Sequence, residues 1–294
     1  MGKGGAYENP RTISGQSSRE CWRGGCVDSR SAFLFVPLRN CGYTLARKAR
    51  IQYIPGMTWQ TYKAKIESIR MLAPNISELV LTLVDPPVLR FQSGQAMAVT
   101  IPASFSEIPT RRYYSLVSPQ SSARQICLLF DQGEQGVGSQ FLRCQPVGAE
   151  LILEGPFGTF GLQENFERDL LFVATGTGIA PIRSMIATLL ENAMPRCITL
   201  LWGLRRECDV YYLDEFEAWA SHYPQFSFVL TLTQAEAQWT GSRGRVTQVL
   251  EEMPHLEQFT AYVCGGRKMV KDVTALLYER GVVQVYRERH HDVL

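Results

Sequence analysis

The chain has 294 residues, of which 45% are hydrophobic and 20% are charged, as in ordinary globular proteins. This length exceeds one average domain, so two compact domains and an extension are expected. The formal net charge of +2 is too small for the basic footprint of a nucleic-acid-binding protein, so no nucleic-acid partner is predicted.

Residues 1–56 form a polar segment rich in Gly, Ser, Arg and Cys, which ends at the Pro55-Gly56 break. The segment lacks the apolar stretch of a secretory signal. The eight cysteines of the chain are spread without the dense spacing of a disulfide scaffold. Most of them are therefore expected to be reduced, in a cytoplasmic protein.

Residues 59–160 consist of short runs of alternating hydrophobic and polar residues, separated by turn signals. Six runs are predicted to be strands of an antiparallel barrel, at 62–72, 77–85, 96–102, 112–118, 125–131 and 149–158. One short helix is predicted in this part, at 138–145.

Residues 165–294 follow a different rhythm, in which strands alternate with helices. Strands are predicted at 170–175, 198–203, 226–233 and 261–266, and helices at 180–193, 213–223, 246–253 and 268–281. This alternation is typical of a doubly wound parallel sheet with helices on both faces. The apolar run 170–190 is interrupted by Pro181, Arg183 and a Gly/Thr cluster, which favours strand, loop and helix there over membrane insertion.

The loop that begins at Thr175 contains two glycines and joins a predicted strand to a predicted helix. Glycines let backbone N–H groups approach a pyrophosphate closely, and the N-terminus of a helix favours negative charge. Pro181 stands where a first-turn proline is tolerated. Taken alone, the pattern also fits a plain structural turn.

The run RRYYS ends at Ser115 in a predicted strand of the barrel. Strand alternation puts Arg112 and Tyr114 on one face, with Tyr113 and Ser115 on the other. A guanidinium suits a phosphate, and an aromatic face suits an isoalloxazine ring. Taken alone, the run fits an edge strand with exposed aromatic residues better.

A third motif, GVGS, begins at Gly136 and places small residues at the start of the short predicted helix. Its N–H groups and the Ser139 hydroxyl are suited to a second diphosphate. As a single glycine-rich turn it has little specificity.

The order and spacing of five motifs carry more information than any one of them. The succession RRYYSLVS, GVGSQFL, ATGTGIAPIRS, LLWGLRRECDVYYLDEF and YVCGGRKMV resembles the ferredoxin–NADP reductase superfamily, in particular its oxygenase-coupled reductases of the phenol hydroxylase and dioxygenase type. The resemblance covers about Lys63 to Gly281. It implies an enzyme that moves electrons from NAD(P)H through FAD to a protein acceptor, such as an oxygenase component or a ferredoxin.

The resemblance also implies which residues bind the cofactors. For FAD these are Arg112, Tyr113, Tyr114, Ser115, Gly136, Val137, Gly138 and Ser139. For the nicotinamide dinucleotide they are Thr175, Gly176, Thr177, Gly178, Pro181, Arg205, Asp209, Tyr211, Cys264, Gly265 and Gly266. Ser115 and Cys264 are the predicted contact point for hydride transfer, although a cysteine at a strand end is often simply a small buried residue.

Hydride transfer demands little acid–base chemistry from the protein, which orients the two cofactors and excludes water. A 2′-phosphate calls for Arg or Lys near the end of the third strand of the second part, and VLTLTQAEAQW has neither. Related enzymes that use NADPH often carry Ser-Arg where this chain has Thr231 and Leu232. NADH is therefore favoured over NADPH, with Arg205 and Arg206 as the nearby basic alternative.

Cys21-x4-Cys26 resembles the start of the plant-type [2Fe–2S] ligand set, which continues with a third nearby cysteine and a distant fourth. The two remaining ligand positions hold Ser29 and Arg47. No stable cluster is predicted, and residues 1–56 are either a degenerate ferredoxin-like segment or a disordered extension.

Relatives commonly end with a glutamate and an aromatic residue near the flavin, and this chain offers Tyr286 and Glu288 without a terminal aromatic. His290 and His291 are expected in a frayed polar tail, and no metal site is predicted. Three alternatives to an oxygenase-coupled reductase stay open. They are a stand-alone flavin reductase or diaphorase, a non-catalytic electron-transfer subunit of a larger complex, and an inactive remnant.

Overall fold

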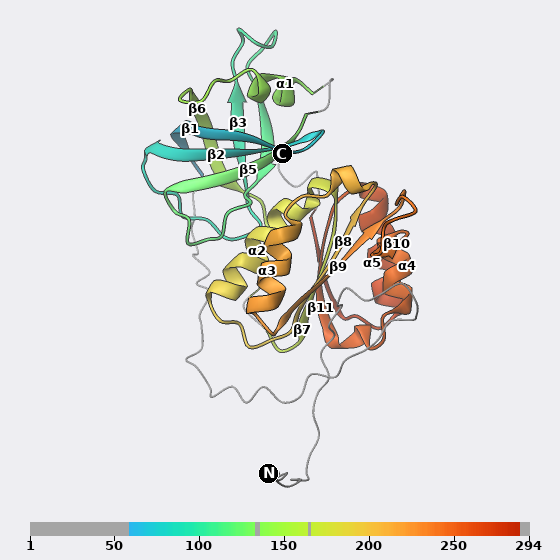
Figure 1. Ribbon diagram of the computed structural model, residues 1–294. Helices are drawn as coiled ribbons and strands as arrows, with labels where there is room; N and C mark the ends of the chain where they lie inside the picture. The colour runs from blue at the N-terminus through green and yellow to red at the C-terminus, as the bar shows by residue number, and fades with distance from the viewer. Residues whose placement is uncertain (1–58, 133–135, 164–165, 289–294) are drawn as a thin grey trace, which may run out of the picture.

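A computed structural model describes residues 59–132, 136–163 and 166–288 of the chain. An antiparallel barrel packs against the edge of a parallel sheet that carries helices on both faces (Figure 1). The predicted fold class is therefore confirmed. The expectations for residues 1–56 and for His290 and His291 lie outside the described residues.

The barrel contains six strands in the order β4-β3-β6-β1-β2-β5. Their bounds are β1 (Gln60–Ala73), β2 (Ile76–Asp85), β3 (Ala96–Ile101), β4 (Thr110–Ser115), β5 (Gln125–Asp131) and β6 (Glu150–Phe157). A bridge between Leu116 and Leu128 closes the sheet. In β1 the alternating residues Tyr62, Ala64 and Ile66 are buried, as the period of two predicts. The short helix α1 (Val137–Arg143) lies beside β3.

The parallel sheet has the order β10-β9-β8-β7-β11-β12. Its strands are β7 (Asp169–Thr175), β8 (Ile198–Leu204), β9 (Phe226–Leu232), β10 (Ser242–Arg243), β11 (Phe259–Cys264) and β12 (Gln284–Arg287). Helices α2 (Ile179–Glu191) and α3 (Leu213–His222) cover one face, and α4 (Val246–Glu252) and α5 (Arg267–Glu279) cover the other (Figure 1). Every residue of β8 and β11 is buried, because strands covered on both faces need apolar side chains in both directions.

The two edge strands of the parallel sheet, β10 and β12, were not predicted. β10 has two residues and β12 has four, and such short strands at an edge lack the long apolar run that marks the central ones. The apolar run 170–190 forms β7, a turn and α2, as predicted. Among the described residues, no helix is long and apolar enough to cross a membrane.

The chain passes from β7 to β8, its neighbour on one side within the sheet, and later returns to β11, its neighbour on the other side. The carboxyl ends of β7 and β11 therefore lie together, with Cys264 paired to Ala174. Ligands of doubly wound folds bind at this switch point, in the crevice outside the carboxyl ends of the strands. A hydrogen-bonded contact from Ser115 of the barrel to Glu288 shows that this edge faces β4.

Candidate functional site

Two glycine-containing loops meet at the switch point. The first, Gly176–Gly178, is a single helical turn after β7, and its Gly176 carbonyl accepts hydrogen bonds from Tyr211 Oη (3.1 Å) and Trp202 Nε1 (3.3 Å). Burial is the main cause that raises the pKa of Tyr211, so its hydroxyl stays protonated and donates. These contacts hold the loop in one orientation above the sheet.

The second loop follows β11 and packs tightly against the first. A Cβ on Gly178 would lie 2.5 Å from the Cys264 carbonyl oxygen, and one on Gly265 would collide with Thr175 Oγ1. Gly265 also has a φ of +150°, which side chains rarely adopt. Glycine at these two positions is therefore what allows the loops to touch.

The remaining two glycines face open space. A Cβ on Gly176 or on Gly266 would meet no atom within 4 Å. Gly266 donates its backbone N–H to Thr175 Oγ1 (3.4 Å), which ties the loops together at this point. Bare backbone bordering free space at the carboxyl edge of a parallel sheet fits the phosphates of a dinucleotide, so these loops suit NAD(P)H.

The motif residues of the barrel lie beside α1. A Cβ on Gly138 would lie 2.8 Å from Arg112 Cγ and would collide with the Tyr114 hydroxyl, so only glycine lets α1 approach these two side chains. Burial is the main cause that raises the pKa of Tyr114 to about 12, and the positive charge of Arg112 opposes it. An arginine, a protonated tyrosine and a small-residue turn thus lie together, a set that fits the phosphates and ring of FAD.

The two arginines of the RRYYS run have different surroundings. Arg111 forms an ion pair of 2.8 Å with Glu154, a buried carboxylate on β6. The exposed Arg112 is bonded only locally among the described residues, from Nη1 to Thr110 Oγ1 and to the Arg111 carbonyl. Arg112 is therefore the arginine whose charge is available to a phosphate.

Tyr113 lies on the opposite face of β4 from Tyr114. Its ring packs edge-on against Phe157, with 5.4 Å between centroids. The structure therefore brings Arg112, Tyr114 and Gly138 together and separates Tyr113 from them, as strand alternation requires.

One carboxylate joins the two halves of the site. Glu288 follows β12, and its oxygens accept hydrogen bonds from Cys264 Sγ (2.8 Å) and Ser115 Oγ (3.3 Å). The Glu288 backbone N–H donates to the Val263 carbonyl (3.1 Å), which fixes the residue beside β11. The two side chains predicted from sequence as the contact point therefore meet on a third one.

The Cys264 thiol is fully enclosed at the end of β11, with 1% of the residue exposed. Burial, together with the charge and the hydrogen bond of Glu288, raises its pKa well above the ordinary value. The thiol stays protonated and acts as a hydrogen-bond donor. This group orients neighbours and supplies no base, which suits hydride transfer.

Glu288 was noted in the sequence but was not assigned to the site. The signal for it was weak, because a single glutamate near the C-terminus has no flanking motif. A cleft of about 320 Å³ opens beside it, bordered by Phe157 and Gly158 of the barrel and by Tyr278 and Tyr286 of the parallel sheet and its helices.

The other predicted residues lie around these loops. Thr177 is exposed between the two glycines, and Pro181 is buried in the first turn of α2. Asp209 accepts the backbone N–H of Arg206 (3.1 Å), so its carboxylate holds the turn after β8. Gly136, Val137 and Ser139 lie at the start of α1, and Arg205 is exposed after β8.

The structure places Thr231 and Leu232, the two positions considered for a 2′-phosphate, inside β9. Thr231 and Leu232 are 0% and 1% exposed within β9, and Thr231 Oγ1 donates to the Gly244 carbonyl (3.0 Å). The exposed residues at the end of this strand are Thr233 and Gln234. The apolar pattern alone does not say where a buried strand stops.

Comparison with known families gives two matches that together cover most of the described residues. Residues 63–161 match the oxidoreductase FAD-binding domain, and residues 172–275 match the oxidoreductase NAD-binding domain.

Individual proteins agree with these matches. The chain is 30% identical over 244 residues to ferredoxin–NADP reductase B of Sorangium cellulosum, which covers 79% of this chain and 96% of that one. It is 32% identical over 229 residues to the reductase component DmpP of phenol 2-monooxygenase from Pseudomonas sp. strain CF600, covering 75% of this chain but only 63% of the relative. Among solved structures, the Amycolatopsis cytochrome P450 reductase GcoB has a TM-score of 0.71 at 25% identity, covering 79% of this chain and 70% of that one.

Proposed function

The chain belongs to the ferredoxin–NADP reductase superfamily and is an oxidoreductase that moves electrons from NAD(P)H through FAD. From this premise we propose that its electron acceptor is a protein, either an oxygenase component or a ferredoxin. We propose the division at 59–160 for the FAD-binding domain and at 165–294 for the NAD(P)-binding domain. A cytoplasmic location and the absence of an iron–sulfur cluster stay predictions from the sequence.

The observation that carries this function is the bridge from Ser115 through Glu288 to Cys264. It joins the strand of the flavin motif to the loop that borders the dinucleotide space. A bound FAD would supply the chemistry, as the acceptor of a hydride from NAD(P)H and the source of electrons for the acceptor. The protein's part is to hold the two reactants in contact and to keep water out, and the bridge, in which the Cys264 thiol is buried, supports that role.

A protein acceptor is supported by the relatives. The reductases similar to this chain include components of phenol and terephthalate oxygenase systems and a ferredoxin–NADP reductase. The chain spans less than two thirds of the phenol reductase component.

The purified, FAD-loaded chain is expected to bleach its flavin absorbance on addition of NADH without any acceptor. Cytochrome reduction is then expected to rise at least about tenfold when a ferredoxin is added, because a docked carrier reacts faster than a diffusing one. Equal cytochrome reduction with and without ferredoxin would favour the diaphorase alternative. No bleaching with either NADH or NADPH would overturn the reductase function itself.

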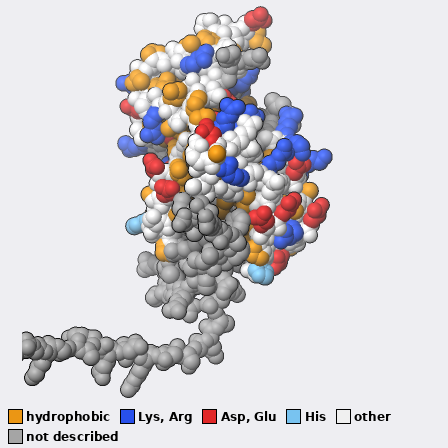
Figure 2. Space-filling view, turned by 45° about the vertical axis from the view of Figure 1, so that its right-hand side comes forward, with side chains coloured by type: hydrophobic (Ala, Val, Ile, Leu, Met, Phe, Trp, Pro, Cys, Tyr) orange, Lys and Arg blue, Asp and Glu red, His pale blue; other side chains and the backbone are white. Residues whose placement is uncertain are grey.

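We infer the preferred nucleotide from the charged side chains at the carboxyl edge of the parallel sheet. Figure 2 shows Lys and Arg side chains gathered near the middle of one face, at the level where the parallel sheet adjoins the barrel in Figure 1. The exposed basic residues at the carboxyl edge of that sheet include Arg205, Arg206, Arg243, Arg267 and Lys268. Such positive charge suits any dinucleotide, so it does not by itself indicate a 2′-phosphate.

Two of the basic side chains near the end of β9, those of Arg243 and Arg206, are already engaged. Arg243 donates to the carbonyls of Ala235, Glu236, Ala237 and Trp239, at 2.7 to 3.2 Å. Arg206 Nε donates to Gln234 Oε1 (3.2 Å). The carboxylate of Glu207 accepts the Glu236 backbone N–H (2.8 Å), which adds negative charge to this loop. These contacts support NADH as the preferred reductant.

We expect kcat/KM for NADH to exceed that for NADPH by about tenfold or more. The 2′-phosphate of NADPH would lie beside carboxylates and would lack a charge-assisted hydrogen bond. Gln234→Arg is expected to raise kcat/KM for NADPH about tenfold and to leave that for NADH nearly unchanged. Gln225→Arg, at the other end of β9, adds the same charge and serves as the control. A native preference for NADPH, or equal effects of both variants, would contradict the assignment.

A further inference from the structure

Helix α2 lies against the segment 117–121, which follows β4, and polar contacts join the two along the helix. Side chains of α2 at helical spacing meet successive residues of that segment. The contacts are Arg183 Nη1 to the Val117 carbonyl (2.9 Å), Ser184 Oγ to the Ser118 carbonyl (2.6 Å), the Gln120 backbone N–H to Thr188 Oγ1 (3.0 Å) and Ser121 Oγ to Glu191 Oε2 (2.8 Å). We call this row of contacts the seam.

The middle of the seam is shielded from water. Ser184 is 0% exposed and Thr188 is 2% exposed. Thr188 Oγ1 also shares a hydrogen bond of 2.6 Å with Ser93 Oγ, a second buried group of the barrel. Because buried polar groups are costly to leave without partners, separating the two surfaces here is unfavourable unless water enters.

A second set of contacts, which we call the clamp, lies at the start of α3. Tyr212 Oη donates to Glu78 Oε2 on β2 (2.5 Å), and Arg70 Nη2 on β1 donates to Glu78 Oε1 (2.7 Å). The Glu78 side chain is 8% exposed, so leaving it without these hydrogen-bond partners would be costly. Burial and the Glu78 carboxylate raise the pKa of Tyr212, which keeps the hydroxyl protonated.

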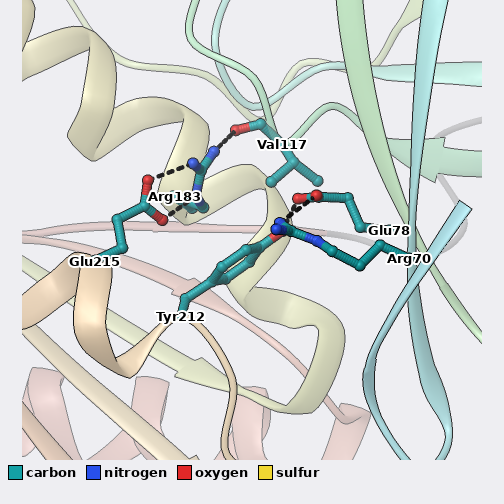
Figure 3. Close-up of polar contacts among 6 residues, drawn as sticks. All are labelled: Arg70, Glu78, Val117, Arg183, Tyr212 and Glu215. Atoms are coloured by element: carbon teal, nitrogen blue, oxygen red, sulfur yellow. Dashed lines mark hydrogen bonds and ion pairs between the residues drawn. The ribbon is translucent and has the colours of Figure 1, made fainter. Parts of the chain in front are cut away.

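Tyr212 adopts a backbone conformation that is unusual for its residue type, with a φ of +56°. Left-handed conformations are uncommon outside glycine, asparagine and aspartate, and they persist where surrounding contacts hold them. Here the conformation places the ring at the barrel surface with its hydroxyl on Glu78 (Figure 3).

Arg183 connects the clamp to the seam (Figure 3). Its Nε and Nη2 donate to both oxygens of Glu215 (2.7 and 2.5 Å), and its guanidinium lies 4.8 Å from the centre of the Tyr212 ring. Burial alone would lower the pKa of Arg183, but the paired contact with Glu215 outweighs it and raises the pKa. One charged group therefore lies over the Tyr212 ring and bonds to the Val117 carbonyl of the barrel.

The two elements of the seam, the segment 117–121 and α2, both begin next to the reactive site. The seam begins at Val117, shortly after Ser115 of the bridge, and α2 begins directly after the loop Gly176–Gly178. A shift of α2 along the segment would therefore move the dinucleotide loop relative to the flavin motif. Reaction of two bound groups is sensitive to such shifts, since about 1 Å of misplacement costs on the order of a hundredfold in rate.

We propose that Arg183 and Tyr212 are positioning residues, which hold the nucleotide-binding sheet against the barrel at the separation that hydride transfer requires. The inference rests on electron transfer from NAD(P)H to FAD. Neither side chain belongs to the loops that border the dinucleotide or to the flavin motifs. Their loss should therefore change the rate of flavin reduction more than the binding of either cofactor.

The first test is Tyr212→Phe, which removes one hydroxyl and keeps the ring under Arg183. In stopped-flow mixing with NADH, the limiting rate of flavin reduction is expected to fall about tenfold, with KM for NADH within about twofold and FAD content unchanged. The control is Tyr223→Phe at the far end of α3, whose ring packs on His222. It should reduce flavin at the native rate.

A second readout does not depend on activity. Hydrogen–deuterium exchange at the segment 117–121 and along α2 is expected to become several-fold faster in Tyr212→Phe and to stay unchanged in Tyr223→Phe. A change in exchange with a native reduction rate would mean that the clamp is only structural, and it would overturn the proposal.

Thr188→Val tests the seam without the clamp, and it decides the matter if Tyr212→Phe does not fold. Valine has nearly the same shape but accepts no hydrogen bond from the Gln120 backbone N–H. Slower flavin reduction and faster hydrogen exchange at the Gln120 backbone N–H are therefore expected. Thr188→Ser keeps the hydroxyl and should restore both. Native reduction rates in Thr188→Val and Tyr212→Phe would overturn the proposal. Failure of the wild-type chain to reduce flavin would instead overturn the reductase function.

Discussion

Replacing Gly178 with alanine is expected to destabilise the chain by about 1–3 kcal/mol and to abolish flavin reduction at ordinary NADH concentrations. The new Cβ would lie 2.5 Å from the Cys264 carbonyl oxygen and 2.8 Å from the Gly265 Cα. Both are backbone atoms, which cannot turn aside as a side chain can. The φ of Gly178 is −60°, so the effect arises from lack of space and not from backbone strain.

Gly266→Ala is the matched control for Gly178→Ala. Gly266 has a φ of −56° and nothing within 4 Å of an added Cβ, so alanine there fits the folded chain. Its stability should be equal or slightly higher, by about 0.4–1 kcal/mol. The methyl group enters the space assigned to the dinucleotide, however, so KM for NADH should rise. Thermal unfolding and steady-state kinetics of both variants check this pair. Native stability and KM in Gly178→Ala would contradict the packing of the two loops.

Replacing Glu288 with leucine is expected to slow flavin reduction by NADH about a hundredfold while FAD stays bound. The substitution removes the one acceptor shared by Cys264 Sγ and Ser115 Oγ, so both donors lose their orientation. Cys264→Ala should lose part of this rate, because Ser115 keeps its partner. Cys264→Ser keeps a donor and should lie between Cys264→Ala and the native chain.

The exposed Cys208 provides the control for loss of a thiol, and Cys208→Ala should react at the native rate. Rapid-mixing measurements of the flavin absorbance give these rates directly. If Glu288→Leu reduces its flavin as fast as the native chain, the bridge has no part in the reaction.

The pH dependence provides a further check on the Cys264 donor. Its pKa is raised, so the protonated thiol is present at low pH and would be lost only as pH rises through that elevated value. Flavin reduction should therefore stay level through about pH 8.5, where an ordinary thiol ionises. A fall in rate centred near that pH, absent from Cys264→Ser, would contradict a protonated Cys264.

The sequence by itself determined the two kinds of sheet and the places where glycine is needed. In β1, burial of Tyr62, Ala64 and Ile66 follows an alternation that can be read without a structure. The loops at Gly176 and Gly265 follow apolar strands, so their position at one edge of a parallel sheet was also predictable. These features are local, since each depends on spacing within a short stretch of chain.

Only the tertiary structure decided which side chains meet. Ser115 and Glu288 are 173 residues apart, and Glu78 and Tyr212 are 134 apart. No periodicity connects such pairs, because their contact depends on how the barrel packs on the parallel sheet. The same packing fixed the roles of neighbours that look alike in the sequence, since Arg111 pairs with Glu154 and leaves Arg112 available. Local spacing thus predicted the frame of the site, and long-range packing selected the residues that complete it.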